Sequence, residues 1–228
     1  MGVILRIDVD SPYGWQSFGK KVFNYLRHYY WFPAIKKLGY LESLDKLVND
    51  LEKRNVPAIF FFTVLTIPKN MEPYGTYEVG PHIVSARNYK QFIDELNQIS
   101  KKLQRKPRGF TKHGSGKLKL SRRHAPEYTP EKYIEWAQKA KLKYFLGNGE
   151  NPEEKPYKVN DVLVYPSAFW LNEAYRAKRY DINWLAKESN KRDIIVLFHP
   201  YEWATNPQVR KDYERMMDKI NNFKTLDA

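Results

Sequence analysis

Short apolar runs alternate with longer helical patterns along most of this chain, and this alternation limits the folds available to it. The runs have the length and β-branched content of strands, whereas apolar residues in the intervening segments recur at helical spacing. The predicted strands are Val3–Asp10, Ala58–Val64, Tyr77–Ile83, Arg108–His113, Tyr144–Gly147, Val162–Tyr165 and Ile194–His199. Strands that alternate with helices form βαβ units, so we expect an α/β protein with a mostly parallel sheet.

The intervening segments also carry signals for the ends of helices. Pro130 stands where a first helical turn begins, and Asp181 is a candidate N-cap. The predicted helices are Leu41–Lys53, Tyr89–Leu103, Glu131–Lys139, Asp181–Glu188 and Asn206–Asn221. About seven strands allow a closed or nearly closed barrel in a single domain over residues 1–228, with an open doubly wound sheet as the alternative. In both folds, ligand sites lie at the carboxyl ends of the strands.

The composition limits the partners and the compartment. The 228 residues include 39 Lys and Arg against 26 Asp and Glu, a net charge of +13. This excess attracts polyanions such as acidic glycans, although a solvated basic surface gives the same count. No zinc-finger, RRM or basic heptad pattern is present, so we expect no specific nucleic-acid partner. The chain has no cysteine, which excludes disulfides, thiolate zinc sites and cysteine nucleophiles. No apolar run suits a secretory signal or a membrane span, so the expected location is cytoplasmic.

The first predicted strand carries charged side chains on one face. Side chains alternate between the two faces of a strand, so Arg6, Asp8 and Asp10 point the same way. The opposite face is apolar and consists of Val3, Leu5, Ile7 and Val9. If the apolar face meets the helices, the charged face enters the barrel, where charges are costly unless they are paired or bind a metal. A strand-end aspartate that caps the next loop is the simpler alternative for Asp10.

Three of the five histidines stand at the ends of predicted strands, namely His82, His113 and His199. Imidazole and carboxylate together suit zinc or a similar divalent ion, and a strand-end histidine also suits proton transfer. Each histidine alone would equally fit a satisfied core position, but three of them beside an aspartate pair form a more specific pattern. Gly114 and Ser115 follow in a glycine-rich turn that lacks P-loop spacing, and backbone amides there are candidates for holding an oxyanion.

Four segments resemble the motifs of the polysaccharide deacetylases, also called carbohydrate esterase family four. Ile7–Pro12 is similar to the aspartate motif, and Glu78–His82 is similar to the segment with the metal histidine. Pro107–Phe110 with its following turn resembles the third motif, and Ile195–Pro200 resembles the terminal histidine motif. Their order and spacing cover nearly the whole chain. The resemblance implies a distorted (β/α)7-type barrel that hydrolyses N- or O-acetyl groups on a sugar with a divalent metal ion.

The resemblance also implies roles for individual residues. Asp8 would be the general base, and His199 would be the general acid for the leaving group. Asp10 and His82 would hold the metal ion, for which zinc is the expected identity. Amides near Gly114 would complete the oxyanion site.

The chain departs from the family pattern at several positions. The family's two aspartates are adjacent, whereas here Val9 separates them. The family's second metal histidine falls at Ala86, and we expect His113 to replace it from the neighbouring strand. The third motif's arginine falls at Thr111, and Lys112 is the candidate for the missing positive charge.

These observations predict a metal-dependent hydrolase that removes an acetyl group from a saccharide or glycan precursor, with an acid-bearing sugar as one candidate. The alternative is a catalytically inactive barrel of this type that binds a glycan or a protein partner, which the missing second histidine favours. The predicted substrate contacts are Lys112, Gly114, Ser115 and Trp170. We also expect aromatic and basic residues beyond the strand ends to surround one pocket, among them Tyr13, Trp15, Lys117, Arg122, Arg123 and Trp203.

Overall fold

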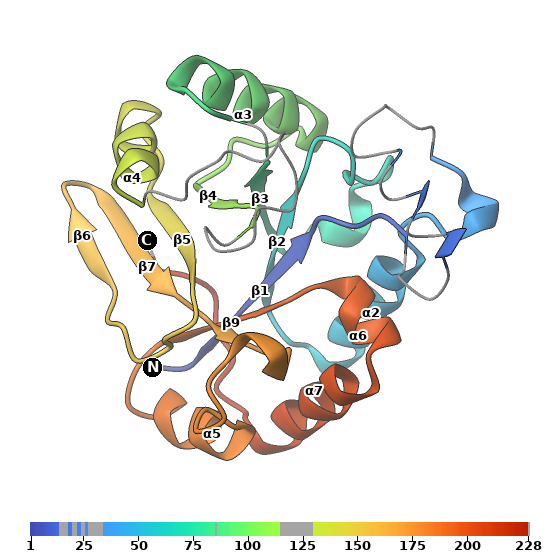
Figure 1. Cartoon of the computed structure of the whole chain (residues 1–228), viewed down its shortest axis with the longest axis vertical. Coiled ribbons are helices and arrows are strands. Elements are labelled where there is room, and N and C mark those ends of the chain that lie inside the picture. The colour runs from blue at the N-terminus through green and yellow to red at the C-terminus, as the bar shows by residue number, and fades with distance from the viewer. Residues whose placement is uncertain are drawn as a thin grey trace.

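A single sheet organises the computed structural model of the chain (Figure 1). The structure describes residues 1–13, 18–19, 22–23, 26, 34–84, 86–114 and 130–227. Its strands are β1 (Val3–Val9), β2 (Ala58–Phe62), β3 (Glu78–Ile83), β4 (Gly109–Lys112), β5 (Tyr144–Gly149), β6 (Tyr157–Val159), β7 (Val162–Ser167), β8 (Phe169–Trp170) and β9 (Ile194–Phe198). The strand order is β6-β7-β5-β4-β3-β2-β1-β9-β8, and every neighbouring pair is parallel except β6 with β7.

The sheet curls into a distorted barrel because one continuous segment of chain pairs with a strand on each side of the sheet. β7 pairs with β5, and after Ala168 the chain continues as β8, which pairs with β9. The Ala168 N–H donates to the Gly149 carbonyl at 3.0 Å, and the Leu171 N–H donates to the Leu197 carbonyl at 2.9 Å. With β7 and β8 taken as one bent strand and β6 set aside, the nine strands make seven barrel positions. The predicted distorted (β/α)7-type barrel is therefore confirmed.

The alternation in β1 separates the barrel interior from the layer of helices. Ile4 packs inside the barrel, where Arg6 and Asp8 are also buried, at 0% and 2% exposure. The apolar interior cluster comprises Ile4, Ile59, Phe61, Tyr144, Leu146, Tyr165, Ala168, Trp170, Ile195, Leu197 and Leu226. The opposite face of β1 joins the larger core shared with the helices, through Val3, Leu5, Ile7 and Val9. The charged face of β1 thus enters the barrel, as the alternation predicts.

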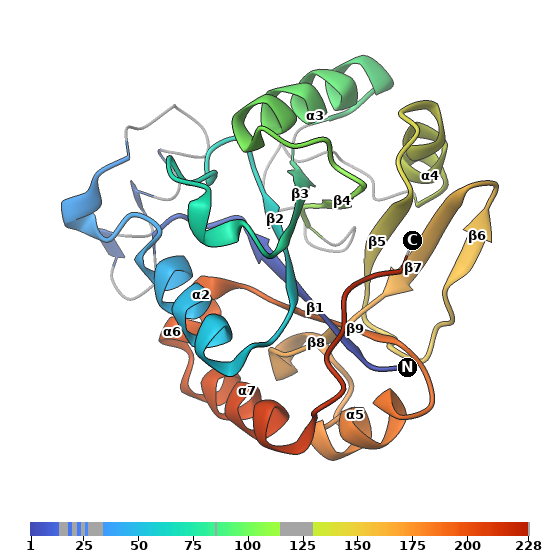
Figure 2. The same ribbon diagram turned by 180° about the vertical axis from the view of Figure 1, so that it is seen from behind.

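Helices surround the sheet on its outer side (Figures 1 and 2). They are α2 (Glu42–Arg54), α3 (Tyr89–Leu103), α4 (Pro130–Lys139), α5 (Ile182–Ser189), α6 (Pro200–Thr205) and α7 (Pro207–Lys219), with short 3-10 turns η1 (Lys36–Leu38), η2 (Glu72–Tyr74) and η3 (Glu173–Tyr175). Asp181 caps α5, as predicted, by accepting a hydrogen bond from the Trp184 N–H at 2.8 Å. No helix in the described ranges has both the length and the apolar character needed to cross a membrane.

Two glycines leave room for aromatic rings inside the barrel. A Cβ atom at Gly80 would lie 2.9 Å from the Phe61 ring, and one at Gly109 would lie 2.3 Å from the Tyr144 ring. Real Cβ contacts are almost never this short. Both rings belong to the interior cluster, so these glycines set how closely neighbouring strands can pack around the barrel.

The C-terminal segment covers the end of the barrel where the strands begin. The Val3 N–H donates to the Asn222 carbonyl, and the Lys224 N–H donates to the Val3 carbonyl. Leu226 then packs in the interior cluster with Ile4. Since this end is filled, the accessible side of the barrel is the one at the carboxyl ends of the strands.

Candidate active site

A fully buried arginine lies beneath the site. The Arg6 Nε and Nη2 atoms donate to the two carboxylate oxygens of Asp8 at 3.0 and 2.6 Å. Arg6 Nη1 donates to the carbonyls of Gly147 at 2.6 Å and Leu146 at 3.2 Å, and Nη2 also donates to Asn148 Oδ1 at 2.6 Å. A guanidinium has five N–H groups, and here all five are used. The strand pattern required the inward charges to be paired or to bind a metal, and for Arg6 and Asp8 the structure shows pairing.

Asn148, at the end of β5, extends this network to the chain around His113. Its Nδ2 atom donates to the Lys112 carbonyl at 2.5 Å and to the Gly114 carbonyl at 3.1 Å. Its Oδ1 atom accepts from Arg6. The Asn148 amide therefore holds the backbone on both sides of His113.

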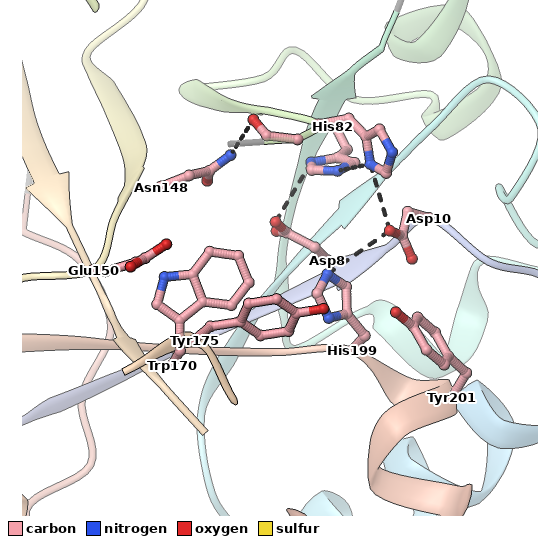
Figure 3. A pocket seen from close by; sticks show the side chains of 11 residues that line it. Asp8, Asp10, His82, Asn148, Glu150, Trp170, Tyr175, His199 and Tyr201 are labelled. Carbon is pink, nitrogen blue, oxygen red and sulfur yellow. Dashed lines mark hydrogen bonds and ion pairs between the residues drawn. The ribbon is translucent and has the colours of Figure 1, made fainter. Parts of the chain in front are cut away.

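Three side chains from three strand ends converge above this floor (Figure 3). Asp10, His82 and His113 each place a potential metal-ligand atom within 4.8 Å of the others. His82 Nε2 lies 3.1 Å from His113 Nδ1, which lies 3.4 Å from Asp10 Oδ2. The other ring nitrogen of His82 lies 2.6 Å from Thr111 Oγ1 and 3.5 Å from Asp8 Oδ2. A hydroxyl and a carboxylate behind an imidazole are typical supports for a metal-binding histidine.

Asp10 itself has the features of a cation ligand. Its Oδ1 atom is buried and has no hydrogen-bond partner within the described part of the chain. Burial raises the pKa of Asp10 to about 6, with Asp8 and Glu202 adding to the effect and His199 opposing it. A buried carboxylate oxygen without a partner is costly, and a metal ion would satisfy it. The two imidazoles and the carboxylate therefore fit a divalent ion of the zinc type.

His199 follows β9 directly and forms a pair with a glutamate of α6. His199 Nδ1 lies 2.9 Å from Glu202 Oε2, and Asn172 Nδ2 donates to the other oxygen of Glu202 at 2.8 Å. His199 Nε2 lies 3.7 Å from Asp10 Oδ2. Burial disfavours the imidazolium, but the Asp10 and Glu202 carboxylates outweigh it and raise the pKa of His199 to about 9. This histidine is therefore arranged to hold a proton at neutral pH.

Aromatic side chains and one carboxylate form the outer wall of the pocket (Figure 3). Trp170 packs against Tyr175 with ring centroids 5.0 Å apart, and its Nε1–H donates to the Gly149 carbonyl at 3.3 Å. Tyr201 lies on the other side of His199, with ring centroids 5.4 Å apart. Glu150 is exposed at the same wall. The pocket thus combines an acid–base floor with aromatic sides.

Solved structures with this architecture identify the fold. A Pseudomonas aeruginosa PAO1 protein described as a "probable polysaccharide deacetylase" aligns over 98% of this chain and 87% of its own, with a TM-score of 0.57 and 11% identity. A Streptococcus mutans CE4 esterase aligns over 99% of this chain and 85% of its own, with a TM-score of 0.52 and 12% identity. The fold is that of the polysaccharide deacetylases. PuuE allantoinase shares this fold, with a TM-score of 0.58 and 10% identity over 98% of this chain and 86% of its own.

Sequence comparison gives no closer relation. No protein-family model matches the chain, and no curated protein matches it. Structures of a CE4 family pseudoenzyme from Bacillus anthracis align with 94–99% of this chain at TM-scores of 0.45–0.46, and the chain spans 63–67% of their length. The matches with TM-scores above 0.5 establish the fold, and they do not establish an activity or a substrate.

The structure brings together most of the predicted site residues. The pocket is lined by Asp8, Asp10, His82, His113, Gly114, Asn148, Glu150, Trp170, Tyr175, His199 and Tyr201. Lys112 does not reach it, because this residue is 3% exposed and its Nζ atom donates to the carbonyls of Val84 at 3.2 Å and His113 at 2.8 Å. The predicted Ser115, Trp15, Lys117, Arg122 and Arg123 lie outside the described residues. Tyr13 and Trp203 are buried, at 0% and 4% exposure, and do not line the pocket.

Several site residues were missed by the sequence reasoning. Asn148 lies two residues after the inward-facing Leu146, so extending the predicted strand beyond Gly147 would have found it, and Glu150 follows the end of that strand. Glu202 stands three residues after His199, a spacing that places two side chains on one face of a helix. Tyr175 and Tyr201 carried no comparable signal in the sequence.

Proposed function

We propose that this chain is a metal-dependent hydrolase that removes an N- or O-linked acetyl group from a saccharide. The observation that carries the proposal is the convergence of Asp10, His82 and His113 beside a paired His199 in one pocket. The likeness of the fold to that of polysaccharide deacetylases supports this reading. A location in the cytoplasm stays a prediction.

Asp10, His82 and His113 would hold the metal ion, with zinc as the proposed identity. A bound divalent ion would polarise the acetyl carbonyl and make the attacking water more acidic. The support of His82 by Thr111 and Asp8 favours an orientation in which its Nε2 atom faces the ion.

Asp8 and His199, on two sides of the pocket, carry the two proton transfers of the reaction. Asp8 accepts the proton of the attacking water, and Arg6 fixes the direction of its carboxylate through two hydrogen bonds. His199 donates a proton to the departing nitrogen or oxygen of the sugar, and Glu202 holds the imidazole by its Nδ1 atom. Gly114 lines the pocket with a φ of 80°. The backbone N–H groups of Gly114 and the adjacent Ser115 would donate hydrogen bonds to the developing oxyanion.

Acetate release tests this function. The metal-free protein should release no acetate from acetylated oligosaccharides. The same protein should release acetate after one equivalent of Zn²⁺ is added. Asp10→Ala should abolish release, whereas Glu173→Ala, which changes an exposed carboxylate outside the pocket, should not. A metal-loaded wild-type protein that binds acetylated oligosaccharides and releases no acetate would contradict the proposal and favour an inactive glycan-binding barrel.

A further inference from the structure

One carboxylate at the pocket wall has no role in the proposed chemistry. Glu150 follows β5, is exposed, and makes no hydrogen bond or ion pair in the described part of the chain. It lines the same pocket as Asp10 and His199, and Figure 3 shows its carboxylate beside the Trp170 indole. An unpartnered charge at the wall of a binding pocket is available to a ligand.

Two basic side chains of the described residues pack next to the pocket lining, and both are already occupied. Arg6 uses all of its N–H groups within the barrel floor. Lys112 is buried, and its ammonium donates to two backbone carbonyls. No lysine or arginine lines the pocket among the residues that the structure describes. Within the described ranges, this part of the pocket wall therefore carries the negative charge of Glu150 and no positive side chain.

Trp170 determines what kind of group can meet Glu150. Its indole N–H is already donated to the carbonyl of Gly149, the residue before Glu150. The indole therefore offers a ring surface and not a donor, and its contact with Tyr175 holds that surface in place. A ring surface packs on the apolar face of a sugar, while the adjacent carboxylate, which can only accept, requires a hydrogen-bond donor.

We propose that Glu150 and Trp170 form a subsite for a sugar residue that presents hydrogen-bond donors and carries no negative charge. This inference rests on the proposed function for its ligand class. Glu150 accepts hydrogen bonds from a hydroxyl or an ammonium group of the sugar. The same carboxylate repels a carboxylate or phosphate at that position, so the subsite excludes acidic glycans.

Calorimetric binding of three tetrasaccharides to the zinc-loaded protein tests the subsite. The probes are chitotetraose, which is neutral, its fully deacetylated form, which is cationic, and a hyaluronan tetrasaccharide, which is anionic. The wild-type protein should bind the neutral or the cationic probe at least about 10-fold more tightly than the anionic one. A preference between the first two shows whether Glu150 meets hydroxyl or ammonium groups.

The variants assign this discrimination to Glu150. Glu150→Gln should reduce the preference for the neutral or cationic probe over the anionic one, and Glu150→Lys should remove or reverse this preference. Glu173→Lys makes the same charge change at an exposed residue outside the pocket and should leave it unchanged. Unchanged discrimination in Glu150→Lys, a wild-type preference for the anionic probe, or no binding of any probe would overturn the subsite. Binding with the expected preference but without acetate release would contradict the proposed function alone.

Discussion

The pair of His199 and Glu202 links proton donation to a single carboxylate. Glu202 is one of the three carboxylates, with Asp10 and Asp8, that raise the pKa of His199 to about 9. A general acid must carry its proton, so turnover should fall as the pH rises through the pKa of His199. In Glu202→Gln this pKa is lowered, and the alkaline fall in kcat/KM should move to lower pH. Glu173→Gln is the control, and an alkaline limb at the same pH in Glu202→Gln would exclude Glu202 as the residue that positions His199.

The proposed base and acid can be separated from the metal site by substitution. Asp8→Asn and His199→Ala should each reduce turnover about 100-fold or more, which is typical when an acid or a base is removed. At saturating zinc both variants should hold the ion, because neither residue belongs to the group of three ligands and Asp8 only supports His82 from behind. Circular dichroism, zinc content and acetate release measure the three properties. Near wild-type turnover in both variants would refute the assigned mechanism.

Asn148 acts on the metal site through the backbone. It donates to the carbonyls on both sides of His113, and Asn148→Asp would replace those donors with acceptors of the same shape. Zinc affinity should fall by roughly 10-fold or more, the effect expected of groups that orient metal ligands. Asn183→Asp makes the same exchange on the exposed surface of α5 and should have no effect. Unchanged zinc affinity in Asn148→Asp would show that His113 keeps its position without this amide.

The sequence predicts those site residues whose position follows from strand alternation. Asp8 and His82 lie one residue before the end of a strand, Asp10 and His199 follow a strand directly, and all four line the pocket. The pairing of Asp8 with Arg6 was not specified by the pattern, because pairing and metal binding both satisfy an inward charge. Which side chains meet across the barrel depends on its closure, and closure is a tertiary property.

At the scale of secondary structure, the close packing of β4 against β5 depends on Gly109. A Cβ at this position would lie 2.3 Å from the ring of Tyr144, its partner on β5. Gly109→Ala should therefore lower the free energy of unfolding by about 1–3 kcal/mol, as expected for overpacking. Urea denaturation measures the change. Gly75→Ala is the control, since that residue has a φ of −58° and its nearest contact would be 3.2 Å. Equal effects in the two variants would disprove the role of the Tyr144 ring.

The elements that could not be predicted from the sequence are those that form through contacts with other segments of the chain. All seven predicted strands are present, and α3 has the predicted bounds, Tyr89–Leu103. β8 has two residues and exists through its pairing with β9, and β6 exists through its antiparallel pairing with β7. Strand propensity is weak without such partners. The short α6 begins at Pro200, directly after His199, where the sequence predicted no helix.

At the scale of the whole molecule, the bent strand formed by β7 and β8 links the two sides of the pocket. It brings Trp170 of β8 beside His199, which follows β9, with ring centroids 6.2 Å apart. The C-terminal segment fills the opposite end of the barrel through Leu226. The fold therefore confines ligand binding to the carboxyl ends of the strands, as in other α/β barrels.

The central claim is that this pocket is a metal site in which His113 takes the place of a second histidine of the usual motif. Equilibrium dialysis against Zn²⁺, with the metal content measured per chain, tests it most directly. The wild-type protein should bind about one ion per chain, and His82→Ala and His113→Ala should each lose it, because three protein ligands are the usual minimum for a catalytic zinc site. Full zinc occupancy in His113→Ala, or no zinc in the wild-type protein, would contradict the account.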